Sequence, residues 1–286
     1  MGKLSGYVRI MRPVNCLMMG FAVLVGAALA SPNNLNSMLL SLVYGFVTGF
    51  ALTAASMTIN DYYDREIDAI NEPKRPIPSG LIKPREAILL ATALTIIGFA
   101  TAYLTNLTYP LCLVIAIIAW IIFVTYTTIG KRSGLPGNFL VSMCVTIPFI
   151  YGSIAALGEI KLNVLLFSSM VFLSNTGREI TKGIVDIEGD KTKNVKTLAA
   201  RHGANSAAIA AAAFYLSAVS LSPIPWFLGL VSFWFIPIVL ITDLGLVSSS
   251  FMLLKNHSRE NSRKIKKTVL LWFLVGLLAF AAGTLR

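Results

Sequence analysis

Long apolar stretches separated by short polar segments dominate this chain of 286 residues. Four stretches, at positions 13–60, 87–130, 133–158 and 203–242, contain no Lys, Arg, Asp or Glu. A helix needs about 20 apolar residues to cross a bilayer, so the longer stretches should hold two helices each. Turn-forming residues break them near 31–37, 105–110 and 222–226. The pattern predicts nine membrane-spanning helices, centred near positions 22, 48, 96, 119, 147, 169, 212, 240 and 276.

Composition agrees with this pattern. Hydrophobic residues make up 56% of the chain and charged residues only 13%, about half the usual share for a soluble domain. We therefore expect an all-α, polytopic membrane protein in which residues 1–286 form a single domain. Cys16, Cys112 and Cys144 fall in apolar helices at unrelated spacings, so they are interpreted as packing residues.

Basic residues fall almost entirely on one side of the predicted topology. With nine spans and the N-terminus inside, 22 of the 24 Lys and Arg residues occupy cytoplasmic segments, and only Lys161 and Arg286 lie outside. This bias predicts the orientation by the positive-inside rule. The excess charge of +11 therefore sits on one face, so membrane lipids are expected as partners and nucleic acid is not. The last cytoplasmic run is interpreted as a topology signal that meets anionic headgroups; it contains Arg259, Arg263, Lys264, Lys266 and Lys267.

Acidic residues follow a different pattern. Eleven of the thirteen are expected at the cytoplasmic side, and nine of those fall in 61–72 and 179–190. The two exceptions are Glu159, in an outer turn, and Asp243, within the eighth predicted helix. Asp243 has two open interpretations, a functional carboxyl in a wet cavity or a hydrogen bond to a neighbouring helix. An ion-coupled transporter is a remote alternative function, but it would place acids inside the bundle rather than at one surface.

The first acidic segment reads NDYYDREID from position 60. Asn60, Asp64 and Asp68 recur every fourth residue, so they share one face if the second helix continues beyond the membrane. Like charges at this spacing repel each other and favour a cation between them. Oxygen ligands without Cys or His suit Mg²⁺. Asp61 lies about 100° around the helix from Asn60, and its role stays open.

The second acidic segment reads REITKGIVDIEGD from position 178. Asp186 and Asp190 form another pair four residues apart, with Lys182 one turn earlier. Both segments are expected at the same membrane face, where they can meet across one cavity and bind a diphosphate through Mg²⁺. A single such segment would more often be a solvated loop, but two favour a site. Four nearby cations are candidate donors to the diphosphate oxygens: Arg75, Lys131, Arg132 and Lys182.

These segments resemble the signatures of the UbiA superfamily of intramembrane prenyltransferases. The first matches N-D-x-x-D-x-x-x-D and is followed by RPIPSG at 75–80, and the second matches D-x-x-x-D. The resemblance implies nine transmembrane helices around a central cavity with cytoplasmic cap loops. It also implies an active site that opens to the cytoplasmic side of the cell membrane. It implies Mg²⁺ held by Asn60, Asp64, Asp68, Asp186 and Asp190, the four aspartates being catalytic.

The resemblance also bears on the acceptor. Many members carry a Tyr four residues before the Lys that matches Lys182, whereas this chain has Arg178, which disfavours an aromatic acceptor of quinone biosynthesis. The segment is closer to the branch that makes archaeal ether lipids. That branch transfers a geranylgeranyl group from its diphosphate to the hydroxyl of geranylgeranylglyceryl phosphate, so an isoprenyl diphosphate donor and a phosphorylated, lipid-like acceptor are implied. An aromatic prenyltransferase on the same fold is the alternative.

Further cations are candidates for substrate binding. The sequence RPVN from position 12 resembles the start of the family's first helix, which makes Arg12 and Asn15 candidates. A phosphorylated acceptor needs an anion site of its own beside the diphosphate. Unassigned cations near the expected cavity mouth are hypothesised to supply it: Arg12, Lys191, Lys193 and Lys196.

Overall fold

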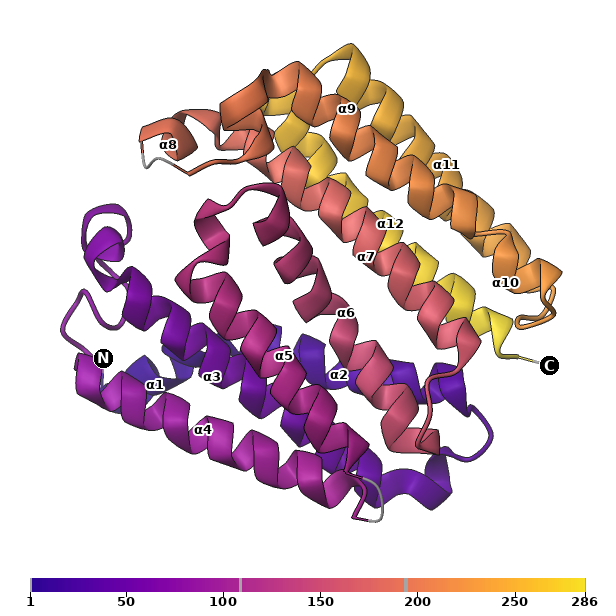
Figure 1. Cartoon of the computed structure of the whole chain (residues 1–286), viewed down its shortest axis with the longest axis horizontal. Helices are drawn as coiled ribbons and strands as arrows, with labels where there is room; N and C mark the ends of the chain where they lie inside the picture. Colours follow the sequence, from indigo (N-terminus) through magenta and orange to yellow (C-terminus); the bar gives the residue numbers. More distant parts are fainter. Residues whose placement is uncertain (1, 108–109, 193–194, 286) are drawn as a thin grey trace. The chain divides into compact units, whose positions relative to one another are not determined.

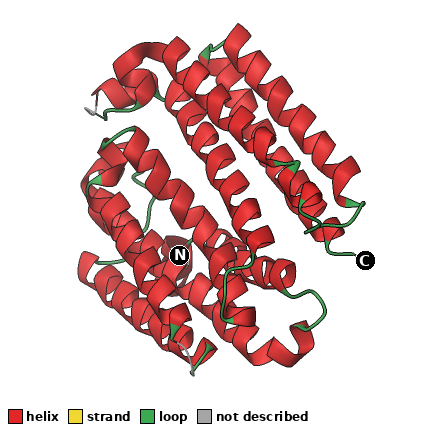
Figure 2. Cartoon of the chain, turned by 45° about the vertical axis from the view of Figure 1, so that its right-hand side comes forward, coloured by secondary structure: helices red, strands yellow, loops and turns green. Residues whose placement is uncertain are grey.

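A computed structural model describes residues 2–107, 110–192 and 195–285. Every regular element in these ranges is a helix (Figure 2). The long helices are α2 (Pro13–Ala30), α3 (Leu39–Asn71), α4 (Pro84–Thr105), α5 (Leu111–Thr128), α6 (Leu135–Leu157), α7 (Leu162–Val185), α9 (Leu198–Leu221), α11 (Phe235–Lys255) and α12 (Arg259–Gly283). The short ones are α1 (Lys3–Met11), η1 (Leu35–Met38), η2 (Gly130–Arg132), α8 (Ile187–Thr192) and α10 (Ile224–Phe227).

Each of the nine predicted centres lies within one of the long helices, which confirms the all-α, polytopic fold class. Eight helices in the described ranges are long and apolar enough to cross a membrane. Helix α7 is not among them because its second half carries polar and charged side chains, including Asn175, Arg178, Glu179 and Lys182. The predicted count of nine spans is therefore not confirmed.

Two compact units make up the chain. Unit 1 comprises Met1–Thr128 and Ile147–Ile160, and unit 2 comprises Ile129–Thr146 and Lys161–Arg286. Helix α6 contributes its first half to unit 2 and its second half to unit 1, with Pro148 close to the division. The expectation of a single domain over 1–286 stays a prediction.

In unit 1, α3 packs against α4 and α2 (Figure 1). Small residues bring backbones close together: Gly26 abuts the backbone of Phe149, and Gly152 abuts that of Val23. Such contacts are the usual basis of helix packing in membranes, where burial from water contributes little. Polar pairs link the same helices, since Thr48 and Thr101 lie 2.8 Å apart through their Oγ1 atoms.

In unit 2, α7 packs against α9, and α12 packs against α11 and α7. The core includes Ile180 and Ile184 of α7 together with Ile265 and Val269 of α12. Buried Tyr215 of α9 shares a hydrogen bond of 3.0 Å with Thr181 of α7. These contacts fix the rotation of α7, and therefore the direction in which its charged side chains point.

Candidate active site

The first acidic segment is the end of α3, which runs 33 residues and continues as a helix through Asn71. Asn60, Asp64 and Asp68 therefore share one face, as their spacing predicts. Asn60 donates from Nδ2 to Oδ2 of Asp64 at 3.0 Å. This bond shows that the side chains of Asn60 and Asp64, one turn apart, lie side by side on that face.

Asp61, whose role the spacing left open, accepts from two arginines. Arg12 Nη2 lies 2.6 Å from Asp61 Oδ1, and Arg75 Nη1 lies 3.3 Å from the same oxygen. Arg75 Nη1 also lies 2.6 Å from Oδ2 of Asp68. Asp61 and Asp68 are only 3% and 6% exposed, and a buried carboxylate requires such charged partners. The structure thus gathers two predicted cations around the first motif.

Local chain geometry explains how these arginines reach the motif. Arg12 separates α1 from α2 with φ of +53°, and it is the one described residue other than glycine with positive φ. A left-handed residue costs roughly 1–2 kcal/mol, and the ion pair with buried Asp61 offsets this strain. The RPIPSG turn that carries Arg75 is anchored because Ile77 and Ile82 pack in one cluster with Ile10.

Asn15 lies on α2 beside α3. Its Nδ2 lies 3.8 Å from Sδ of Met57, within the distance for a weak hydrogen bond to sulfur. Met57 precedes Asn60 by about one helical turn, which places Asn15 near the first motif. Unit 1 therefore contains Arg12, Asn15 and Arg75 next to the first acidic motif.

The second motif departs from the continuous helix that its spacing suggests. Helix α7 ends at Val185, and Asp186 is its exposed C-cap with φ of −105° and ψ of 9°. The amide of Asp190 still donates to the carbonyl of Asp186 at 2.9 Å, so the one-turn separation survives in α8. Thr197 at the start of α9 donates from Oγ1 to Oδ2 of Asp190 at 2.9 Å. The Asp190 carboxylate is therefore fixed by Thr197, whereas Asp186 is exposed at the end of α7.

Cations surround the second motif within unit 2. Glu179 accepts from Arg178 at 2.9 Å and from Lys182 at 3.2 Å. Lys182 lies one turn before Asp186, and Glu179 about two turns before it. The carbonyl of Arg132 accepts from the Lys196 amide at 3.1 Å, which brings the Lys131 and Arg132 turn beside the chain that follows the motif.

Gly134 makes this approach possible. Its φ is +76°, and a side chain there would overlap the Lys196 carbonyl. The segments around 131–134 and 195–197 are therefore neighbours, as a shared anion site requires. Of the other candidate cations, Lys191 and Lys196 are exposed, and Lys193 lies outside the described residues.

One residue near this motif was missed by sequence reasoning. Lys266, interpreted as a topology signal, is half-buried on α12, and its ammonium is within electrostatic range of Asp186 and Lys182. Arg259 at the start of α12 donates from Nε to the carbonyl of Val185 at 3.1 Å, which ties the two helix ends together. The helical position of Lys266 beside apolar Ile265 and Val269 is the signal that separates it from the other cations in its run.

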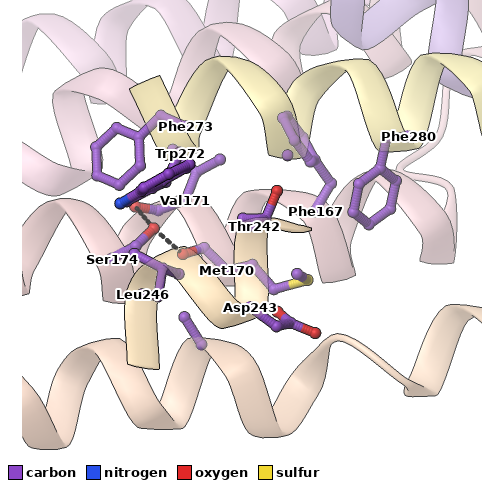
Figure 3. Close-up of a pocket in the computed structure, with 12 residues that line it drawn as sticks. Phe167, Met170, Val171, Ser174, Thr242, Asp243, Leu246, Trp272, Phe273 and Phe280 are labelled. Carbon is purple, nitrogen blue, oxygen red and sulfur yellow. Dashed lines mark hydrogen bonds between the residues drawn. The ribbon is translucent and has the colours of Figure 1, made fainter. Parts of the chain in front are cut away.

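The Asp243 carboxylate, on α11, accepts a hydrogen bond from the end of α9. Ser222, which ends α9, donates from Oγ to Oδ2 of Asp243 at 2.6 Å. Figure 3 shows Asp243 at a small pocket that also includes Trp272 and Phe280. The cavity of about 40 Å³ has room for water but is far below the roughly 300 Å³ of small-molecule sites. It is too small to accommodate a long isoprenyl chain.

The ligand set fits magnesium shared with a phosphate compound. Among the described residues, no three His, Cys, Asp or Glu side chains gather as a metal cage. Mg²⁺ does not require one, because it usually takes one or two carboxylates and completes its shell with waters and phosphate oxygens. The carboxyl and amide oxygens of the two motifs are of this type. Asn60, Asp64 and Asp68 belong to unit 1, whereas Asp186 and Asp190 belong to unit 2.

Comparison with known proteins defines the class. The sequence model of the UbiA prenyltransferase family matches residues 19–283, a range that contains both acidic motifs. The chain belongs to this family, as the resemblance of the motifs indicated. It is a prenyltransferase and a multi-pass membrane protein.

Two relatives within the family are similar to this chain over almost its full length. The chain is 38% identical over 280 residues to digeranylgeranylglyceryl phosphate synthase of Archaeoglobus fulgidus, covering 96% of this chain and 93% of the relative. A solved structure described as giving insight into digeranylgeranylglyceryl phosphate synthase in membranes superposes with a TM-score of 0.87 and 31% identity, covering 99% of each chain.

A more distant structure shares the fold alone. It is a UbiA homologue from Archaeoglobus fulgidus bound to GPP and Mg²⁺, with a TM-score of 0.69 and 19% identity, covering 96% of this chain and 99% of that chain.

Proposed function

We propose that this prenyltransferase moves a geranylgeranyl group from geranylgeranyl diphosphate to the hydroxyl of geranylgeranylglyceryl phosphate, in a reaction that depends on Mg²⁺. The product would carry the second ether bond of an archaeal membrane lipid. The observation that carries the proposal is the similarity, along 96% of the chain, to a digeranylgeranylglyceryl phosphate synthase. Arg178 supports the same acceptor class, because it stands where many family members carry a Tyr, a departure that disfavours an aromatic acceptor of quinone biosynthesis.

In this mechanism the residues of both motifs bind the donor diphosphate. Asn60, Asp64 and Asp68 act from α3, and Asp186 and Asp190 act from the end of α7 and from α8. Their oxygens would hold Mg²⁺, which would supply neutralisation of the negative charge that grows on the leaving diphosphate. The proposal requires both sets of ligands to serve one diphosphate.

Basic and amide side chains orient the donor. Guanidinium and ammonium groups make short, charge-assisted hydrogen bonds to phosphate oxygens. Their donors face charge that increases as the bond breaks, and so they lower the barrier. The residues in this role are Arg75, Lys131, Arg132 and Lys182, with Arg12 and Asn15 at the start of α2.

The transfer itself replaces one carbon–oxygen bond with another. The allylic C–O bond breaks and its electron pair leaves with the diphosphate. The acceptor hydroxyl oxygen then bonds to the allylic carbon, and its proton passes to a base or to the released diphosphate. The chain's contribution is to hold the two reactants in line and to exclude water from the allylic cation.

The cytoplasmic opening of the site is supported by the one-sided distribution of Lys and Arg. Single cysteine variants test it in a background without native thiols. Lys264→Cys should react with a membrane-impermeant maleimide only in inverted vesicles, and Lys161→Cys only in vesicles of native orientation. The reverse pattern would place the motifs at the outer face.

The decisive assay for the reaction uses the purified full chain with Mg²⁺ and radiolabelled geranylgeranyl diphosphate. Three acceptors are compared: geranylgeranylglyceryl phosphate, its dephosphorylated form, and an aromatic acid of quinone biosynthesis. We expect an ether product with the phosphorylated lipid alone. Equal turnover of the phosphorylated and dephosphorylated lipids would remove the anion site proposed for Arg12, Lys191, Lys193 and Lys196. Transfer to the aromatic acid would replace the proposed function.

A further inference from the structure

Lys266 differs from the other cations of its run in where its side chain lies. Residues 259–267 contain six charged side chains, and Lys264 and Lys267 are exposed. Lys266 is half-buried, because its neighbours Ile265 and Val269 pack in the core of unit 2 with Ile180 and Ile184 of α7. A cation that only sets topology gains nothing from burial, which costs solvation free energy.

The surroundings of Lys266 are those of the second acidic motif. Its ammonium interacts through space with Asp186, Lys182, Arg178 and Glu179, which lie on successive turns at the end of α7. The bond from Arg259 to the carbonyl of Val185 fixes the start of α12 at this helix end. Lys266 therefore belongs to the charged cluster of the motif, although 80 residues separate it from Asp186 in sequence.

The cluster has more positive than negative charge. Both oxygens of Glu179 are engaged, one by Arg178 and the other by Lys182. In the part of the chain that the structure describes, Lys266 has no ion pair within 4.0 Å. Three cations beside two acids, one of them an exposed carboxylate at a helix end, form an arrangement that an anion would complete.

We propose that Lys266 binds a substrate phosphate group beside Asp186. The inference rests on the proposed function, which supplies two such groups, the diphosphate of the donor and the phosphate of the acceptor. Lys is a compact, mobile point charge with three donors, which suits either group. The residue is a binding residue in this role, distinct from the carboxylates that hold Mg²⁺.

Steady-state kinetics of the full-length enzyme show whether Lys266 binds the diphosphate of the donor or the phosphate of the acceptor. Lys266→Gln removes the charge, and Lys266→Arg keeps it. Loss of one charge-assisted hydrogen bond costs about 1.5–3 kcal/mol, so Lys266→Gln should raise one KM by about 10- to 100-fold while kcat changes by only a few fold. A rise in the KM of geranylgeranyl diphosphate assigns the donor, and a rise in that of the acceptor assigns the glyceryl phosphate. Lys266→Arg should restore most of the affinity.

The matched control is Lys264→Gln, which removes the same charge from an exposed position on the same helix. Both KM values of this variant should stay within about twofold of the parent. If Lys266→Gln behaves like Lys264→Gln, the proposal is overturned and Lys266 serves topology alone. If Lys266→Gln does not fold, Lys266→Met provides the same comparison, because its apolar stem preserves packing in the half-buried position.

Thermal shifts measure phosphate binding by Lys266 without relying on prenyl transfer. Inorganic pyrophosphate with Mg²⁺, and glycerol phosphate separately, should raise the Tm of the parent and of Lys264→Gln, since a ligand that binds only the folded state stabilises it. Lys266→Gln should lose one of the two shifts. If the parent transfers no prenyl group to any acceptor but retains a Lys266-dependent shift, the proposed function fails and the phosphate site stands. Equal shifts in both variants would overturn the site.

Discussion

Arg75 donates from Nη1 to Oδ2 of Asp68 across 2.6 Å. The arginine follows the aspartate by seven residues, so the bond closes the turn that leads out of α3. The same nitrogen lies 3.3 Å from Asp61, and the single guanidinium therefore serves two buried carboxylates. It reduces the repulsion along the first motif and fixes the position of the guanidinium that we propose binds the donor diphosphate.

Arg75→Ala should weaken both folding and donor binding. The variant removes the cation that pairs with buried Asp61 and Asp68, which should lower the free energy of unfolding by about 1–3 kcal/mol. It should also raise the KM of the diphosphate donor by about tenfold or more. Thermal unfolding and donor titration measure the two effects. Arg85→Ala, an exposed position at the start of α4, is the control, and identical behaviour of the two variants would show that Arg75 has no such role.

Asp64→Ala and Asp186→Ala should each lower kcat by about 100- to 1000-fold, since each removes a carboxylate that, in the proposed mechanism, holds Mg²⁺ against the transition-state charge. Glu188→Ala is the control, because it deletes an exposed carboxylate between Asp186 and Asp190. Near-normal transfer by a folded Asp64 or Asp186 variant would exclude that residue from the mechanism.

A double variant that combines Asp64→Ala with Asp186→Ala tests whether the motifs from the two units serve one diphosphate. Residues that act as a unit lose little more together than singly. The double variant should therefore be about as slow as the slower single one. Fully multiplicative losses would indicate two independent sites.

Asp243 should tolerate conversion to Asn. The amide oxygen of Asn can accept from Ser222 as the carboxylate does, so Asp243→Asn should transfer prenyl groups within about twofold of the parent. Asp243→Leu should instead lower the free energy of unfolding by about 1–3 kcal/mol, because it removes the hydrogen bond that links α11 to the end of α9. The Ser222 hydroxyl can then donate only to the Val219 carbonyl at 2.9 Å, within its own chain segment. An inactive Asp243→Asn with an unchanged Tm would assign the carboxylate a functional role.

Gly152→Ala should destabilise unit 1. A methyl group at Gly152 overlaps the backbone of Val23 on α2, and overpacking of this kind costs about 1–3 kcal/mol. Thermal unfolding in detergent measures the loss. Gly2→Ala is the control, since a side chain there meets no atom within 4 Å. An unaltered Tm for Gly152→Ala would mean that α2 and α6 can separate at no cost.

Local periodicity predicted the first motif well because one helix contains it. Asn60, Asp64 and Asp68 share a face in any continuous helix, and α3 provides that helix. The spacing of the second motif was equally regular, but α7 stops at Val185. Residue spacing does not reveal where a helix ends, and here the ties from Thr197 to Asp190 and from Arg259 to Val185 connect distant segments.

The cations were harder to assign for the same reason. Arg12 and Arg75 were predicted to bind phosphate, and their pairing with Asp61 depends on the contact of α1 and the RPIPSG turn with α3. Lys266 was assigned to topology because its neighbours in sequence are also basic. Its burial is decided by how α12 rotates against α7, which is a property of packing between helices rather than of the run itself.

Thr197 joins the second motif to the first turn of α9. Its Oγ1 donates to Asp190 and accepts from the amide of Ala200 at 3.3 Å. One hydroxyl thus caps the helix and donates a hydrogen bond to the carboxylate. Movement of Asp190 toward a divalent ion should therefore change how well the Ala200 amide is protected from hydrogen exchange. Hydrogen–deuterium exchange at the start of α9 would then report occupancy of the motif in the intact enzyme without following turnover.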